Sequence, residues 1–329
     1  MKKIIPFLIL ALFTFSCGHK EKEDTYPAFE LTSNGNVPKF NGDTAYAFTA
    51  KQVSFGPRNP GSGGHSEALN YFYNQFEQYT DSVQLQQFSY SGYNNEVLNL
   101  TNIIASFNPD DTNRIMITAH WDTRPRSDND QNPTNVNLPI LGANDGASGC
   151  GVILELARLL KNNKVKYGID LVLLDGEDYG KDDDLDNFCI GTKYFTENMN
   201  GRITPAFAIN LDMVGDKNAS FPVEGYSNQY APDIVNMVWN IADQIGAADF
   251  IRNNYSQIYD DHLILNQGGI KAVDIIDADL VGNHTAGIRR NYWHTQNDNM
   301  KNISAQTLQQ VGDVLTHLIY SLKFTKHSS

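Results

Sequence analysis

Residues that can hold a metal ion or move protons follow an apolar run in the stretch 170–178, DLVLLDGED. A near-continuous apolar run of this length predicts a buried strand of a parallel sheet. The carboxyl ends of parallel strands meet at one crevice, and this crevice is where open α/β sheets bind ligands. We therefore expect Glu177 and Asp178, which come just after the run, to lie in a functional site.

Other candidate residues stand in comparable places. Carboxylates held close together repel one another, so a cluster of them implies a bound cation, a shared proton or both. Zinc binds imidazole nitrogen and carboxylate oxygen, and a catalytic zinc keeps three protein ligands and one open position. Helix capping would explain Asp145 alone, but it does not explain the whole set. The further candidates are His120 and Asp122 in HWDTRP, Asp145 in GANDGASG, Asp212 in NLDMVGD and His294 in YWHTQND.

The elements that must position these residues alternate between strands and helices. Residues 83–90 and 98–107 have the alternating apolar pattern of an edge hairpin. Amphipathic helices separate the later strands, which predicts one α/β domain with a mostly parallel, twisted central sheet and helices on both faces. A chain of 329 residues with 41% hydrophobic content is long enough for such a core. The later strands are predicted at residues 114–119, 170–174, 206–211 and 272–276.

The charge of the chain argues against one class of partner. The formal net charge is −13, and no block of Lys and Arg balances the acidic residues. Nucleic-acid binding needs clustered basic side chains, so we expect no nucleic-acid partner.

The N-terminus has the features of an export signal. Lys2 and Lys3 precede an apolar run at residues 4–15 that is too short to span a bilayer, and Cys17 follows. This order resembles a bacterial lipoprotein signal, with the alternative of a plain signal peptide and an incidental cysteine. We predict a signal peptide at 1–16, a polar tether at 17–40 and a catalytic domain at 41–329. The protein would then be exported and held at the membrane, on its periplasmic or cell-surface side, by a lipid on Cys17.

Two cysteines remain in the mature chain, Cys150 and Cys189. An oxidising compartment would permit a disulfide between them, but their spacing does not show one. Two separate buried thiols are the equal alternative.

Six motifs occur in an order that resembles the zinc aminopeptidase-like family: HWDTRP, GANDGASG, LDGED, NLDMVGD, YDDH and YWHTQND. The resemblance begins near Tyr46, and it is strongest to the bacterial form of the glutaminyl-peptide cyclotransferase branch. It implies a single α/β domain with one catalytic zinc. It also implies substrates that are peptides or proteins with an N-terminal glutamine, which the enzyme closes into pyroglutamate with release of ammonia.

The resemblance also implies roles for individual residues. The family more often has glutamate at the position of Asp178, so the zinc must shift or Asp178 must bind it with different denticity. By resemblance, the zinc ligands are Asp145, Asp178 and His294, the acid and base is Glu177, its acidic partners are Asp212 and Asp260, and the pocket wall is Trp293.

The proposed reaction also makes sense from the chemistry of these side chains. The substrate α-amine must attack its own side-chain amide, and ammonia leaves readily only when its nitrogen is protonated. A zinc on the amide oxygen would stabilise the developing oxyanion. Glu177 would take the amine proton and pass it to the leaving nitrogen, while Asp212 and Asp260, if close, would raise the proton affinity of the coupled group.

Two other functions remain open. His120, Asp145 and Asp212 could hold a second zinc, with Asp122 beside them, and Glu177 would then activate water in a two-zinc aminopeptidase. The tryptophan before His294, the DDH at 260–262 and the run AFTAKQVSFGPRNPGS favour the cyclotransferase. The third interpretation is a surface lipoprotein that binds peptides or glycans on an inactive scaffold, and the intact Glu177 argues against it.

Three further residues attract attention without a predicted catalytic role. His262 follows two acids, and we interpret it as a hydrogen-bonded structural histidine. Arg289 and Arg290 precede His294 closely, and we expect both to be exposed.

Overall fold

The computed structural model describes residues 27–32, 36–181, 184–283 and 290–325. The predicted signal peptide at 1–16 and the first part of the predicted tether, residues 17–26, lie outside the described residues. None of the helices within the described ranges combines the length and the apolar character that a bilayer crossing requires.

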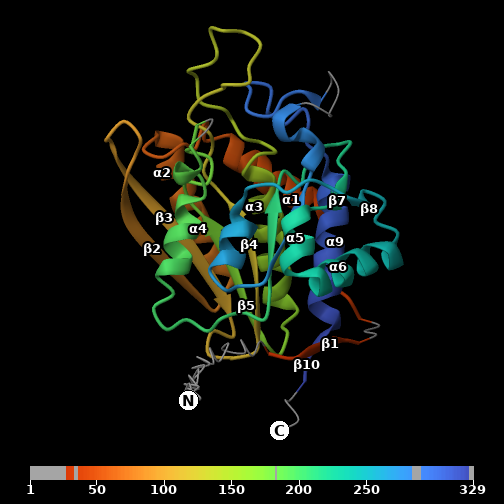
Figure 1. Ribbon diagram of the computed structural model, residues 1–329. Helices are drawn as coiled ribbons and strands as arrows, with labels where there is room; N and C mark the ends of the chain where they lie inside the picture. Colours follow the sequence, from red (N-terminus) through yellow and green to blue (C-terminus); the bar gives the residue numbers. More distant parts are fainter. Residues whose placement is uncertain (1–26, 33–35, 182–183, 284–289, 326–329) are drawn as a thin grey trace, which may run out of the picture.

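A six-stranded sheet lies at the centre of the molecule in the order β2-β3-β5-β4-β6-β9 (Figure 1). Strands β5, β4, β6 and β9 run parallel to one another, whereas β3 pairs antiparallel with both β2 and β5. The predicted edge hairpin and mostly parallel sheet are therefore confirmed. The bounds are Ser82–Ser91 for β2, Val97–Phe107 for β3, Arg114–His120 for β4, Gly168–Leu174 for β5, Ala208–Asp212 for β6 and Ala272–Ile276 for β9.

Burial along the strands explains why the sequence patterns differ. Every residue of β4 and β5 is buried, which matches their continuous apolar runs. Strand β2 lies at the edge and alternates between half-buried and exposed positions, so its sequence alternates as well. The polar residues that β4 and β5 carry before their ends are buried and paired, as Arg114 of β4 is with Asp170 of β5.

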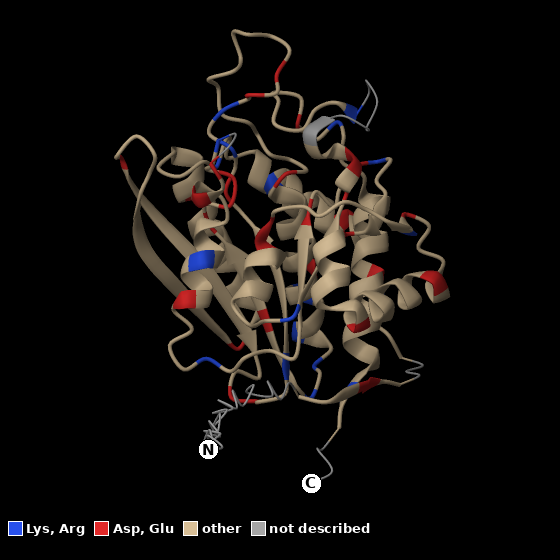
Figure 2. Ribbon diagram, in the orientation of Figure 1, with Lys and Arg blue, Asp and Glu red and all other residues tan. Residues whose placement is uncertain are grey.

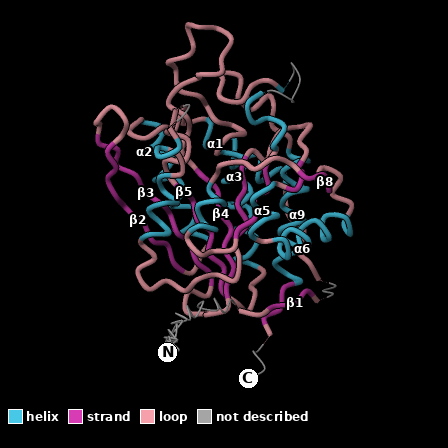
Figure 3. The backbone as a smooth tube through the Cα atoms, in the orientation of Figure 1, coloured by secondary structure: helices cyan, strands magenta, loops and turns pink. Residues whose placement is uncertain are grey.

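Helices cover both faces of the sheet (Figure 3). The larger core contains residues of α1, α2, α3, α6 and α9, and a smaller core on the other face contains residues of α4 and α7. The helices are α1 (Gly42–Val53), α2 (Gly63–Tyr79), α3 (Ala147–Asn162), α4 (Ile190–Glu197), α5 (Gly225–Tyr230), α6 (Pro232–Ile245), α7 (Asp261–Gln267) and α9 (Ala305–Ser321), with 3-10 turns η1 (Leu185–Asn187) and η2 (Ala278–Asn283).

Two short sheets were not predicted. Strand β1 (Phe29–Leu31) pairs antiparallel with β10 (Leu322–Phe324), and β7 (Phe221–Val223) pairs parallel with β8 (Phe250–Asn254). Strand β1 falls inside the range predicted as a polar tether, so this part of the range differs from the prediction. Its backbone partners come from the far end of the chain, and no local pattern could reveal them.

Charged residues are spread over the fold (Figure 2). In this view of the described residues, Lys and Arg lie singly among acidic residues and form no continuous basic stripe.

Candidate metal centre and catalytic site

The candidate residues meet where the parallel strands end. His120 is the last residue of β4 and Asp212 the last of β6, while Glu177 and Asp178 follow β5. A cavity of about 70 Å³ lies beside them. Its lining includes Asp145, Glu177, Asp178, Asp212, Asp260 and His294, with apolar walls from Phe188, Met213, Ile258, Tyr259 and Trp293.

Asp145, Asp178 and His294 form the first cluster, which we call the metal cluster. Each offers a ligand atom within 4.8 Å of the others, and all three residues are buried. His294 Nε2 lies 3.4 Å from Asp178 Oδ1 and 3.6 Å from Asp145 Oδ2. Asp145 Oδ2 and Asp178 Oδ2 are buried and have no hydrogen-bond partner. Buried carboxylate oxygens without a partner are costly, so these residues fit a cation, and two oxygens with one imidazole fit zinc.

Asp122 fixes the turn that carries Glu177 and Asp178. Its carboxylate accepts the backbone N–H of Glu177 at 3.0 Å and that of Asp178 at 3.3 Å. The turn also contains Gly176 at φ +76°, a left-handed conformation that favours glycine. Asp122 was predicted as a second-metal ligand or a supporting residue. Besides holding this turn, its Oδ1 lies 3.6 Å from His120 Nδ1, so both roles stay predictions.

Asp298 fixes the loop that carries Asp145 in the same way, although no role was predicted for Asp298. Its carboxylate accepts the backbone N–H of Asn144 at 2.9 Å and that of Asp145 at 3.1 Å. Burial and the nearby charge of Asp145 raise the pKa of Asp298 to about 7. The only signal was its place in the motif YWHTQND, four residues after His294.

Strained backbone also marks the site. Cys189, Met213 and His294 have φ values of +52°, +48° and +54°. Such left-handed conformations cost a non-glycine residue about 1–3 kcal/mol and persist only where the surroundings enforce them. The His294 ring is further fixed by stacking on Trp293, with centroids 3.6 Å apart. The position predicted as an aromatic pocket wall thus lies at the cavity and against a candidate ligand.

Glu177 lies among groups that favour its protonated form. Its Oε1 is 3.7 Å from Cys189 Sγ, and ligand atoms of Glu177, Cys189 and Asp260 lie within 4.8 Å of one another. Burial, followed by the charges of Asp178 and Asp260, raises the pKa of Glu177 well above its usual value, although His120 opposes this. Cys189 was not predicted as part of the site, because a lone cysteine carries no positional signal.

Asp260 is held differently, since its surroundings favour the ionised form. Asn210 Nδ2 donates to Asp260 Oδ2 at 2.9 Å, and Asp260 Oδ1 caps the N-terminus of α7. Burial alone would raise the pKa of Asp260, but hydrogen bonding and charge from His262 outweigh it and lower this pKa. The fold thus places Asp260, whose pKa is lowered, beside Glu177, whose pKa is raised.

His120 forms a second cation-type group with Asp145 and Asp212. His120 Nε2 lies 3.2 Å from Asp145 Oδ1 and 3.3 Å from Asp212 Oδ1. Burial, opposed by the hydrogen bond from His120 and supported by the charge of Asp260, raises the pKa of Asp212 to about 7. Because Asp145 belongs to both groups, the arrangement required for two bridged metals is available, as is an arrangement with one metal and a supporting histidine.

Arg124 was not predicted, and the prediction for Arg290 was wrong. Arg124 lies within the motif HWDTRP, and its Nη1 donates to Asp178 Oδ1 at 2.8 Å. Arg290 was predicted to be exposed, but it pairs with Asp277 and lies 3.3 Å from Asp216 Oδ1. These acids come from segments after β9 and β6, so only the folded chain brings them to Arg290. Arg289 lies outside the described residues.

The cysteine alternatives are resolved by the structure. Cys150 and Cys189 are both buried and free, so they are two separate thiols. Burial raises the pKa of both thiols, which keeps them protonated.

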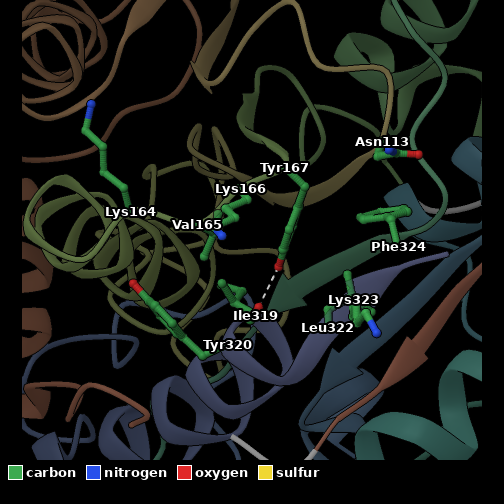
Figure 4. A pocket seen from close by; sticks show the side chains of 10 residues that line it. All are labelled: Asn113, Lys164, Val165, Lys166, Tyr167, Ile319, Tyr320, Leu322, Lys323 and Phe324. Atoms are coloured by element: carbon green, nitrogen blue, oxygen red, sulfur yellow. Dashed lines mark hydrogen bonds between the residues drawn. The ribbon is translucent and has the colours of Figure 1, made fainter. Parts of the chain in front are cut away.

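A wider hollow of about 460 Å³ lies at the opposite edge of the sheet (Figure 4). Its residues include Asn113 and Tyr167, which precede β4 and β5. Tyr167 Oη donates to the Ile319 carbonyl at 2.6 Å and closes one side. None of the described residues that line it is acidic or a histidine, so it lacks the residue types that make up the metal cluster.

Comparison with known proteins places the chain in a family. The model of peptidase family M28 matches residues 102–319. The crystal structure of Bacteroides thetaiotaomicron glutaminyl cyclase bound to N-acetylhistamine is 40% identical, with a TM-score of 0.82 over 87% of this chain and 99% of that one. A Zn-dependent exopeptidase from Parabacteroides distasonis is 38% identical, with a TM-score of 0.82 and the same coverage.

Curated relatives match less of their length. The alkaline phosphatase isozyme conversion protein of Escherichia coli (strain K12) is 32% identical over 203 residues, which are 57% of this chain and 56% of that protein. The chain thus spans about half the length of this relative. The predicted fold class and the resemblance to bacterial glutaminyl-peptide cyclotransferases are confirmed by the solved structures. Zinc agrees with the exopeptidase relative, whereas the number of ions and the roles of individual residues stay predictions.

Proposed function

The chain belongs to peptidase family M28, and from that premise we propose that it is a zinc-dependent glutaminyl-peptide cyclotransferase. Its substrates would be peptides or proteins with an N-terminal glutamine, which it converts to pyroglutamate with release of ammonia. One zinc, held by Asp145, Asp178 and His294, is proposed as the cofactor. The solved glutaminyl cyclase that is 40% identical over most of this chain supports the proposal.

One observation carries the reaction type. Glu177 and Asp260 offer carboxylate oxygens within 4.8 Å of each other at the wall of the small cavity that also contains the metal cluster. Cyclisation needs a proton to leave the α-amine and a proton to reach the amide nitrogen, and these two nitrogens are only a few bonds apart in the substrate. Two adjacent carboxyl groups of unequal pKa suit such a transfer.

Asp260, Glu177 and Trp293 have separate roles in the proposed reaction. Ionised Asp260 orients the α-amine, and Glu177 in its carboxylate form accepts a proton from it before returning that proton to the leaving nitrogen. When bound, zinc supplies Lewis-acid polarisation of the amide carbonyl. Trp293 and the apolar walls hold the glutamine side chain folded toward its own amine and exclude water that would hydrolyse the amide.

The second candidate is a two-zinc aminopeptidase. The group of His120, Asp145 and Asp212 favours it, because its contacts of 3.2 and 3.3 Å would allow a second ion bridged by Asp145. In that case Glu177 would activate water and the products would be free amino acids.

A single assay separates the two. Purified protein is incubated with a glutamine-initiated dipeptide, and ammonia and free amino acid are measured separately. The cyclotransferase releases ammonia and leaves the peptide bond intact. Release of free glutamine without ammonia would establish the aminopeptidase instead, and about one zinc per chain is expected for the first function.

The matched variant for this assay is Glu177→Gln, which keeps the shape of the side chain. Loss of a general acid and base should lower turnover by about 10²–10⁴-fold. Zinc content, measured on the same sample, should not change, because Glu177 lies outside the metal cluster. Equal loss of zinc would instead make Glu177 a ligand.

We further propose that the protein is exported and held at a membrane through a lipid on Cys17. The sequence of residues 1–17 supports this. Labelling with a radioactive fatty acid tests the proposal, and a Cys17→Ser variant that is labelled equally would contradict it.

A further inference from the structure

Arg124 lies beside the metal cluster and touches one of its members. Its Nη1 donates to Asp178 Oδ1 at 2.8 Å, and its side chain is 1% exposed. The other carboxylate oxygen, Asp178 Oδ2, is buried without a hydrogen-bond partner. The guanidinium therefore binds Oδ1, which also lies 3.4 Å from His294 Nε2, and leaves Oδ2 without a hydrogen bond.

The guanidinium is itself firmly held. Arg124 Nε and Nη2 donate to the two oxygens of Asp128 at 2.7 and 2.6 Å, which is a bidentate pair. The Phe188 ring lies 5.5 Å from the guanidinium carbon. Because its nitrogens bind both Asp128 and Asp178, the guanidinium cannot turn freely, and it restricts the rotation of the Asp178 carboxylate.

Asp128 connects the same arrangement to a second ligand. Its Oδ1 lies 3.8 Å from His294 Nδ1, and the backbone N–H of Asn129 donates to the His294 carbonyl at 3.3 Å. The loop after β4 therefore reaches two members of the metal cluster, through Arg124 to Asp178 and through Asp128 and Asn129 to His294.

From these contacts we propose that Arg124 is a positioning residue for the metal centre. It acts through Asp178, whose short side chain it holds by Oδ1 while Oδ2 has no hydrogen-bond partner and is available to the ion. Groups that orient metal ligands in this way typically contribute about 10- to 100-fold to metal affinity. The inference rests on the proposed zinc site and adds a residue that the reaction itself does not require.

The direction in which zinc affinity changes when Arg124 is removed distinguishes a positioning role from a purely electrostatic one. By charge alone, a buried guanidinium repels a nearby cation, so its removal would tighten zinc binding. Positioning predicts the opposite, because Asp178 would lose its fixed orientation. Arg126 is the matched control: its Nε donates to Asp128 Oδ2 at 3.1 Å, and it has no contact with Asp178 among its hydrogen bonds and ion pairs.

The experiment measures the zinc dissociation constant of the full chain by competition with a chromogenic chelator. Arg124→Gln is expected to weaken zinc binding by about 10- to 100-fold, whereas Arg126→Gln should leave it unchanged or tighter. Arg124→Lys retains the charge without the planar fork and should also weaken binding, so it serves if Arg124→Gln does not fold. In an Asp178→Asn background, Arg124→Gln should cause no further loss.

Three outcomes would overturn the inference: unchanged or tighter binding in both Arg124 variants, an equal loss in Arg126→Gln, or a full additive loss in the Asp178→Asn background. Thermal unfolding of the zinc-free proteins shows whether a variant has only lost its fold. If the unaltered protein binds no zinc, the proposed metal site itself fails, and this result is distinct from the other three.

Discussion

Two buried clusters of histidine and carboxylate lie in the active-site region, and the pKa of the histidine is shifted in opposite directions in the two. In the metal cluster, the carboxylate oxygen nearest to His294 among the described residues is Asp178 Oδ1, which lies 3.4 Å from His294 Nε2. Burial and the charges of Arg124 and Arg126 lower the pKa of His294 well below its usual value. The ring is therefore neutral, which is the form that binds metals.

The second cluster, which we call the imidazolium cluster, consists of Glu224, Asp260, His262 and Asp274. His262 Nε2 lies 2.9 Å from Glu224 Oε2, and His262 Nδ1 lies 3.3 Å from Asp274 Oδ2. Burial alone would lower the pKa of His262, but the surrounding acids outweigh it and raise this pKa well above its usual value. This cluster contains its own cation.

The two clusters differ in the protonation state that the surroundings of their histidine favour. Both contain at least two buried carboxylates, and three residues of each fit the distances of a metal site: Asp145, Asp178 and His294 in the first, and Asp260, His262 and Asp274 in the second. In the imidazolium cluster the acids raise the pKa of the cluster's own histidine. The pKa of His294 is lowered, and the basic groups beside the acids of the metal cluster are Arg124, which donates to Asp178, and His120, which lies 3.2 Å from Asp145. Four experiments test or sharpen this comparison.

The largest effect is expected for His294→Ala. Zinc affinity should fall by more than the roughly 100-fold that loss of a supporting group can cost, because a ligand itself is removed. Turnover should fall with it. Zinc titration and the ammonia assay check both, and zinc binding as tight as in the unaltered protein would exclude His294 as a ligand.

A smaller effect, on stability, is expected for His262→Gln. The change leaves Glu224, Asp260 and Asp274 buried without their cation, which should reduce the free energy of unfolding by about 3–5 kcal/mol. Urea denaturation of the zinc-free protein measures it. His317→Gln, at a half-buried histidine on α9, is the control and should change stability by about 0.5 kcal/mol or less. An equal loss in both variants would disprove a special role for His262.

The stability difference between His262→Gln and the unaltered protein should also depend on pH. The raised pKa of His262 means that its contribution is complete below the unfolded value of 6.5 and is lost as pH rises through the folded value. Burial alone would raise the pKa of Glu224, but the hydrogen bond and charge of His262 outweigh it and lower this pKa. The contribution of Glu224 to stability is therefore complete above its unfolded pKa of 4.5 and is lost as pH falls. The difference should therefore be largest between about pH 4.5 and 6.5. A difference that grows toward alkaline pH would show that His262 is neutral in the fold.

The smallest effect is expected for Cys189→Ala, which removes a weak donor 3.7 Å from Glu177 Oε1. Loss of one such hydrogen bond corresponds to about 1 kcal/mol, or roughly fivefold in kcat/KM, with zinc binding unchanged. Cys150→Ala is the matched control, because this buried thiol donates to the His120 carbonyl and has no contact with Glu177. A loss beyond tenfold would indicate that Cys189 takes a larger part in catalysis.

The sequence by itself determined which residues stand at the ends of strands. The apolar run before Asp175 and the glycine at 176 are local features, and the structure places β5 and a left-handed turn there. The alternation of strands and helices likewise predicts the parallel part of the sheet, because each element buries its own apolar face. Candidate members of the metal cluster could therefore be named before their distances were known.

The tertiary structure alone decided which of these residues meet. The order β5-β4-β6-β9 sets the spacing between strand ends, and no local pattern specifies it. The contact of Arg124 with Asp178 and that of His262 with Asp274 likewise join segments whose sequences carry no mark of each other. Whether a buried acid attracts an external ion or is neutralised within the protein depends on these contacts, because electrostatic energy follows distance in space and not separation along the chain.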